Sequence, residues 1–131
     1  MSNLIATVSE IKTHDMLHIV EFKCQKKSLY MMSLDLTDDI TIGKKVKLTI
    51  KPSHIAVAKD FTGEISYSNK LDCTIISIEN GKLLSSLKLD FLGFILESII
   101  TLNSSKSMNL KEGDRVTAMV KASELSIIEV L

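Results

Sequence analysis

One short pattern occurs twice in this chain and limits what it can fold into. Ile42–Ser53 reads IGKKVKLTIKPS, and Glu112–Ser123 reads EGDRVTAMVKAS, at a constant offset of 70 residues. Further upstream, LIATVSEI from Leu4 matches LDCTIISI from Leu71 at an offset of 67. Such self-similarity predicts a duplicated structural unit, so we expect two modules, residues 1–64 and 65–131. A unit this small buries little surface on its own, and we expect the two modules to pack together and whole chains to associate.

The hydrophobic residues alternate with a period of two. Segments such as LIATVSEI, MLHIVEFKC and RVTAMVKAS are short and rich in β-branched residues, which predicts strands. Turn signals stand at Gly43, Asn80-Gly81, Gly93 and Glu112-Gly113, and a brief helical turn is expected within Asn103–Asn109. The sequence therefore predicts an all-β fold, a small barrel or sandwich in each module, with at most short helical turns.

The composition excludes several classes of function. Lys plus Arg equals Asp plus Glu, 16 each, and Trp is absent, so the chain lacks the basic excess and the stacking rings of a nucleic-acid binder. Two separate cysteines, Cys24 and Cys73, indicate a reducing, cytoplasmic setting with buried thiols. We see no signal peptide, and no apolar run approaches the roughly 20 residues of a membrane helix.

The repeated Lys-x-Ser pairs bring hydrogen-bond donors together. A Lys ammonium, Ser and Thr hydroxyls and main-chain N–H groups can converge on an oxyanion. This set needs no carboxylate, which argues against acid–base catalysis and against a site for a hard cation. The alternative is that these residues flank strand ends in solvent. The donor set consists of Ser66, Ser68, Thr101, Ser104, Lys121 and Ser123 in the second module and Lys51 and Ser53 in the first.

Other polar residues suggest no further site. His14 and His18 are expected on neighbouring strands rather than as a metal-binding pair on one helix. His54 follows Ser53 and is within reach of a bound anion, but an exposed strand position explains it better. No phosphate-binding loop, nucleophile elbow or paired carboxylates appear. The sequence therefore predicts no enzyme and no direct metal site.

Two segments resemble the molybdate-binding molbindin module, also called the Mop or TOBE domain. ISYSNKL (Ile65–Leu71) is similar to the Ile-Ser-Ala-Arg-Asn-x-Leu opening of that module, and Ile99–Ser123 is similar to its second half. The resemblance covers residues 65–131 well and the first half more loosely. It implies two tandem OB-like β-barrel modules, association into a homodimer or homotrimer, and sites for tetrahedral molybdate or tungstate at module interfaces.

Carried over by position, the resemblance implies a ligand set that differs from the family pattern in two respects. Ser68 stands where the family has an arginine, which removes one cation. In the first module, Ser33 stands for Thr101, and Pro52 lacks the N–H of its counterpart Ala122. That module is then either a weaker site or purely structural. The implied ligands are Ser66, Ser68, Thr101, Ser104, Lys121, Ala122 and Ser123, with Ser33, Lys51 and Ser53 as weaker candidates.

We expect a cytoplasmic protein that binds molybdate or tungstate for storage or homeostasis. One alternative is the sensor half of a molybdate-responsive transcription regulator or a domain associated with a transporter, separated from its effector. An oligomerisation domain that has lost its ligand is a third possibility, and an OB-type binder of nucleic acid or sugar is disfavoured by the composition. No organic cofactor and no membrane partner is expected.

Overall fold

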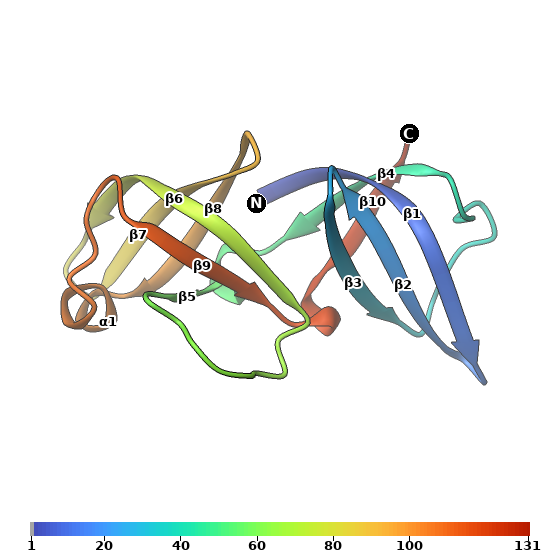
Figure 1. The fold of residues 1–131 in the computed structure, drawn as a ribbon, viewed down its shortest axis with the longest axis horizontal. Helices are drawn as coiled ribbons and strands as arrows, with labels where there is room; N and C mark the ends of the chain where they lie inside the picture. The colour runs from blue at the N-terminus through green and yellow to red at the C-terminus, as the bar shows by residue number, and fades with distance from the viewer. Residues whose placement is uncertain (1) are drawn as a thin grey trace.

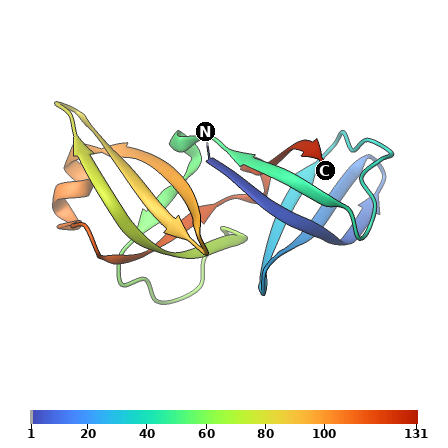
Figure 2. The ribbon, with the colours of Figure 1, turned by 90° about the horizontal axis from the view of Figure 1, so that it is seen from above.

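The computed structural model describes residues 2–131 as two five-stranded antiparallel sheets. The first sheet has the order β10-β4-β1-β2-β3, and the second has the order β5-β9-β6-β7-β8. Figure 1 shows the sheets as two lobes side by side, and Figure 2 shows the same division from above. The elements are β1 (Ser2–His14), β2 (Leu17–Cys24), β3 (Lys27–Ser33), β4 (Lys45–Ile50), η1 (Pro52–His54), β5 (Ala56–Ala58), β6 (Asn69–Asn80), β7 (Leu84–Phe91), β8 (Phe94–Thr101), α1 (Leu102–Ser107), β9 (Arg115–Val120), η2 (Ala122–Glu124) and β10 (Ser126–Val130).

The all-β prediction and the short helical turn are both confirmed, because α1 lies where the capping residues cluster. Within residues 2–131, no helix is long and apolar enough to cross a membrane. The repeat is visible in the register as well. Leu4 pairs with Leu48 in the first sheet, and Leu71 pairs with Ala118 at the equivalent place in the second.

Both long strands also carry a bulge at the same place. The register shifts between Val8 and Glu10 in β1 and between Ile75 and Ser77 in β6. A bulge bends a strand and increases its twist. These bends allow β1 and β6 each to pair with two neighbours while the sheets curl around their apolar faces.

The two halves exchange a strand. β5, which belongs to the first half in sequence, pairs with β9 of the second sheet, and the C-terminal β10 pairs with β4 of the first sheet. The turns η1 and η2 lead into these strands, and they pack on β8 and β3 of the opposite lobes. Their C-terminal neighbours, Ile55 and Leu125, are 1% and 3% exposed. Because of this exchange, the buried residues of both lobes form one continuous apolar cluster.

Further contacts join the lobes at strand ends and hairpin tips. The Asn69 side chain accepts a hydrogen bond from the Tyr30 N–H (2.8 Å) and donates one to the Tyr30 carbonyl (2.9 Å). At the equivalent place, Ser2 Oγ accepts a bond from the Glu97 N–H (2.7 Å). The β2–β3 and β7–β8 tips also meet, since Gln25 Nε2 donates to the Leu92 carbonyl at 3.1 Å. The lobes are therefore held together by polar as well as apolar contacts.

Candidate functional site

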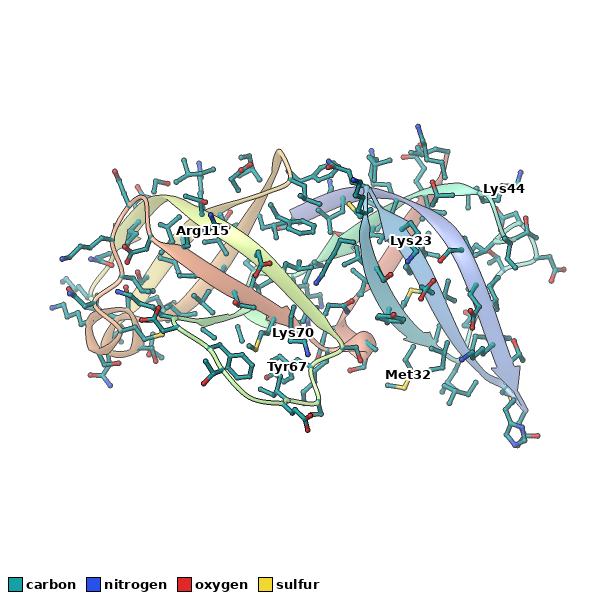
Figure 3. The ribbon with its side chains drawn as sticks, in the orientation of Figure 1. Lys23, Met32, Lys44, Tyr67, Lys70 and Arg115 are labelled. Carbon is teal, nitrogen blue, oxygen red and sulfur yellow. The ribbon has the colours of Figure 1, made fainter. Side chains whose placement is uncertain are left out.

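Lys121-Ala122-Ser123 lies at the junction of the lobes, beside the segment that opens the second half. Val120 pairs with Asn69, so the chain on either side of this pair, Ser66–Ser68 and Lys121, lies at one end of the second sheet. Lys121 Nζ is 5.7 Å from the centre of the Tyr67 ring, within the range of a cation–π contact. Figure 3 shows Tyr67 at this junction. The structure thus brings Lys121 close to the opening segment that contains Ser66 and Ser68.

Main-chain geometry adds a possible donor to this group. Lys121 caps the one-turn helix η2 in extended conformation, and the Glu124 N–H donates to the Lys121 carbonyl at 2.9 Å. The first N–H groups of a helical turn have no partner within that turn. The Ala122 N–H is one of these groups. Lys121, Ala122 and the exposed Ser123 hydroxyl therefore supply donors of three kinds next to one another.

Thr101 and Ser104 form a second pair of donors. Thr101 is the N-cap of α1, and its Oγ1 accepts a hydrogen bond from the Ser104 N–H (3.1 Å) and lies 2.9 Å from Ser104 Oγ. If Thr101 donates in the second contact, the Ser104 hydroxyl proton remains available for a ligand. Figure 1 shows α1 at the outer end of the second lobe, whereas β9 runs from that end to the junction of the lobes. Within one chain, Thr101 and Ser104 therefore lie apart from Lys121.

The first half reproduces the turn but not the donors. Lys51 caps η1 in the same extended conformation, and the His54 N–H donates to the Lys51 carbonyl at 2.9 Å, as Glu124 does in η2. Pro52 occupies the first position of this turn, where a missing N–H costs the fold nothing. It does, however, remove the donor that Ala122 offers. Ser53 is exposed on the same turn.

Ser33 is not among the residues that line the cavity with Lys51. Its hydroxyl is engaged with the main chain of Asp35, at 3.1 Å from both the N–H and the carbonyl. It lines a groove shared with Ser123 of the second half. The hairpin registers pair Ser33 with His18 and Thr101 with Leu84. At the offset of 67, the first-half position corresponding to Thr101 is therefore Leu34 rather than Ser33.

The two one-turn helices meet across the lobes. His54 Nδ1 lies 2.7 Å from Glu124 Oε2, and both side chains are about one-third exposed. A cavity of about 250 Å³ beside this pair contains Lys51 and Ser123. Residues that the sequence assigned to separate modules thus share one pocket. Its walls consist of Thr49, Lys51, His54, Ser123, Glu124 and Ser126.

Sequence reasoning missed Tyr67 and Glu124. Tyr67 stands between two predicted ligands, and an aromatic ring two residues from an alternating strand gives no signal of its own. Glu124 follows the Lys-x-Ser pair as His54 does in the first half. That correspondence predicts that Glu124 and His54 occupy equivalent positions in the two halves. Only the strand exchange makes these two residues neighbours.

His14, His18 and the two cysteines lie in strands, and the fold itself explains their positions. His14 and His18 lie on β1 and β2, and Thr13 Oγ1 is 2.8 Å from His18 Nδ1. Among the described residues, no group of three or more His, Cys, Asp or Glu side chains could hold a metal ion. Cys24 and Cys73 are buried thiols, and burial raises the pKa of Cys73 to about 12. A raised pKa disfavours the reactive thiolate.

Comparison with known proteins identifies the family. The TOBE domain model matches residues 65–127, whereas no curated protein sequence matches the chain significantly. The cytoplasmic molybdate-binding protein ModG, solved with molybdate bound, superposes with a TM-score of 0.86 over 95% of this chain and 93% of that chain, at 23% identity. At that identity, the likeness shows a common fold.

A second solved structure is closer in sequence. A molybdate-binding protein from Sporomusa ovata is 36% identical, with a TM-score of 0.50, and the match covers 51% of this chain and 100% of that chain. The match to this relative therefore extends over its full length, while the fold likeness to ModG extends over both halves of the chain. The chain thus belongs to the TOBE domain family, whose model matches its second half, and its two halves together share the fold of ModG.

Proposed function

We propose that this protein binds molybdate or tungstate in the cytoplasm and serves in storage or homeostasis of the oxyanion. The observation that carries the proposal is the cluster of Lys121, the Ser66–Ser68 segment and the η2 main chain, in a fold shared with ModG. These groups are donors, as a tetrahedral dianion requires. Binding makes and breaks no covalent bond, so the proposed function involves no catalysis.

The complete site, as we propose it, forms between copies of the chain. The junction end of the second lobe offers Ser66, Ser68, Lys121, Ala122 and Ser123. The outer end offers Thr101 and Ser104. Because these two groups lie apart within one chain, a second copy has to supply the missing one. This is consistent with a homodimer or homotrimer, in which the interface closes the site and excludes water from the anion.

The first half is the weaker candidate. Lys51 shares a cavity with the Glu124 carboxylate, which repels an anion. Pro52 donates nothing. We therefore propose that the live site belongs to the second half, and that Lys51 and Ser53 serve chiefly in the contact between lobes.

Isothermal titration calorimetry with molybdate, tungstate and sulfate at equal concentration tests the proposal. We expect heat and saturable uptake with the two larger oxyanions and none with sulfate. Lys121→Ala should weaken binding by about 10- to 100-fold, since a charged hydrogen bond contributes about 1.5–3 kcal/mol. Lys44→Ala, at an exposed turn of the first half, is the matched control and should bind as the wild type does. Absence of heat and of retained metal with both oxyanions would refute the function.

A further inference from the structure

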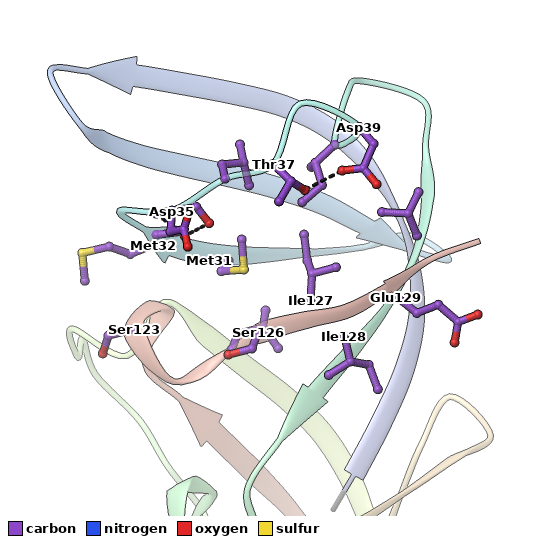
Figure 4. A pocket seen from close by; sticks show the side chains of 15 residues that line it. Met31, Met32, Asp35, Thr37, Asp39, Ser123, Ser126, Ile127, Ile128 and Glu129 are labelled. Atoms are coloured by element: carbon purple, nitrogen blue, oxygen red, sulfur yellow. Dashed lines mark hydrogen bonds between the residues drawn. The ribbon is translucent and has the colours of Figure 1, made fainter.

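The two lobes differ in one place: a helix covers part of the sheet in the second lobe, and the first lobe has no helix there. In the second lobe, α1 packs on β7 and β8, and Lys59 Nζ donates to the carbonyls of Met108 (3.1 Å) and Asn109 (3.2 Å). In the first lobe, the corresponding loop between β3 and β4 (residues 34–44) is two residues shorter than the loop between β8 and β9 (residues 102–114) and contains no helix. A groove of about 450 Å³ therefore remains between β3 and β10 (Figure 4).

The groove has apolar walls and an acidic rim. Met31, Met32, Leu36, Ile127 and Ile128 lie among its lining residues. Its charged lining residues are all carboxylates, namely Asp35, Asp39 and Glu129, and no Lys, Arg or His lines it. Glu129 has a partner in Lys47 at 3.6 Å. Such a surface favours an apolar group that carries a positive charge.

Asp35 and Asp39 are the rim carboxylates that remain open to a new partner. Both are exposed, and neither forms an ion pair within residues 2–131. The Asp39 side chain accepts a hydrogen bond from Thr37 Oγ1, which fixes its position on the rim. A cation that approaches the groove therefore meets two uncompensated negative charges.

An apolar group that carries a positive charge lies on the other lobe of the same chain. The turn between β6 and β7 consists of Gly81, Lys82 and Leu83, followed by Leu84 at the start of β7. Leu83 is 81% exposed and Leu84 is 54% exposed. The Leu102 N–H donates to the Leu83 carbonyl at 2.9 Å, which holds the turn in place. Lys82 is the charged residue of the turn, and Glu79 lies on the strand before it.

We propose that the β6–β7 tip of one copy docks into the β3–β10 groove of a second copy, with Leu83 among the apolar walls and Lys82 at Asp35 and Asp39. The groove and the tip lie on opposite lobes (Figure 1), so a chain cannot fill its own groove. The contact therefore joins two different surfaces of neighbouring copies. It closes either as a ring of several copies or as a pair in which each copy inserts its tip into the other's groove.

The repeat provides an internal comparison for the choice of tip. The equivalent β1–β2 tip is also apolar, with Met16 73% and Leu17 36% exposed, but Asp15 stands where the other tip has Lys82. Asp15 would face the acidic rim and be repelled. The lysine of the second-half tip thus selects that tip over its otherwise similar counterpart.

This contact also deepens the proposed function, on which this part of the argument rests. Thr101 pairs with Leu84 beside the tip, and Ser123 lines the groove. Docking would therefore bring Thr101 and Ser104 of one copy toward Lys121 and Ser123 of the next. The two donor groups that are separated within one chain would meet at the same interface.

Sedimentation equilibrium of the full chain, without ligand, tests the contact. Wild type should be oligomeric, and the double variant Lys82→Glu/Leu83→Ser should raise the dissociation constant of assembly by about tenfold or more. Met16→Ser, the matched change at the other tip, should leave assembly unchanged. Lys82→Glu combined with Asp35→Lys and Asp39→Lys should restore assembly if the charges pair as proposed.

Several results would overturn the contact. These are a monomeric wild type, an unchanged mass of the Lys82→Glu/Leu83→Ser variant, an equal loss in Met16→Ser, or no restoration by the charge swap. All substituted residues except Leu83 and Met16 are charged surface groups, and those two are largely exposed, so circular dichroism should show every variant folded. Molybdate binding by the wild type is measured separately, so failure of the function leaves the contact standing, and failure of the contact leaves the function standing.

Discussion

The Asn69 carboxamide forms two hydrogen bonds with the main chain of Tyr30: its Oδ1 accepts from the Tyr30 N–H, and its Nδ2 donates to the Tyr30 carbonyl. Asn69 begins β6 in the second lobe, and Tyr30 lies on β3, the edge strand of the first. One side chain therefore satisfies both main-chain groups of a residue at an otherwise open sheet edge. Loss of this contact should therefore weaken the coupling between the lobes.

Asn69→Ala should destabilise the protein by about 2–3 kcal/mol. Asn69 is 1% exposed, and the change leaves the part-buried N–H and carbonyl of Tyr30 without partners; a fully buried group of this kind costs about 1–3 kcal/mol before relaxation and water entry. Ser2→Ala at the equivalent place breaks one bond, to the Glu97 N–H, and should cost about half as much. Urea unfolding of both variants measures the difference. Equal, small effects would mean that solvent already satisfies these groups.

Glu124→Gln should have a small effect on stability. His54 Nδ1 lies 2.7 Å from Glu124 Oε2, but both side chains are partly exposed, and such pairs contribute about 0–1 kcal/mol. Urea unfolding of Glu124→Gln and of His54→Gln measures the contribution, and each variant should lose no more than about 1 kcal/mol. A loss of several kcal/mol in either variant would show that the pair contributes more than a partly exposed contact does.

Lys59→Met should loosen the segment after α1. Lys59 donates to two carbonyls and lies 3.3 Å from Asp114, so its loss should cost about 1–2 kcal/mol. The pKa of the Asp114 carboxyl is lowered chiefly by the hydrogen bond from the Lys111 N–H, and Lys59 lowers it further. A lowered folded-state pKa gives stability that is present above the unfolded value of 3.8 and is lost as pH falls through the folded value. Hydrogen exchange of residues 105–110, in wild type and variant, measures the loosening. Lys106→Met on the exposed side of α1 is the control.

The thiols should react with a disulfide reagent only after unfolding. Cys73 is 4% exposed, and burial raises its pKa to about 12, so the neutral thiol persists in the folded protein at pH 8. Burial raises the pKa of Cys24 as well. Since a raised folded-state pKa gives stability that is lost as pH rises, the protein should weaken between about pH 9 and pH 12. Spectroscopic titration of free thiol with and without urea checks the prediction, and rapid reaction of either folded thiol would refute it.

Ser68→Arg should strengthen oxyanion binding. The site proposed around Lys121 has one cation for a dianion, and a second charged donor is expected to raise molybdate affinity by about tenfold or more. Thr41→Arg adds the same charge at an exposed turn of the first half and should change affinity little. Calorimetry at two salt concentrations separates a specific contact from a general effect of charge. An equal gain from both variants would count against Ser68 as a ligand position.

The strands follow closely from the sequence. The period of two predicts the strands, and the offsets of 67 and 70 predict the correspondence between halves. The structure agrees with that correspondence, because the bulges near Ser9 and Ile76 lie at equivalent positions, although the sequence does not predict the bulges themselves. The change of offset also indicates the extra residues that form α1. These features are local, because they depend on residues close together in the chain.

The pairing of the last strands could not be predicted in this way. The alternation of β5 and β10 is satisfied by packing on either lobe, and nothing in Ala56–Ala58 or Ser126–Val130 specifies which. The exchange decides that Lys51 lies near Ser123 and His54 near Glu124. The candidate ligands were therefore identifiable one by one, while their grouping depends on contacts distant in sequence.

The exchanged strands have a consequence for how the protein unfolds and responds to a ligand. Each lobe contains a strand that the other lobe's segment delivers, so opening one sheet withdraws an edge from its neighbour. The two lobes should therefore melt in a single cooperative transition rather than in sequence. An anion held only by the second half then stabilises the first half to the same extent, because it binds a folded state that both halves share. The first half is then stabilised against unfolding by an anion that it does not itself bind.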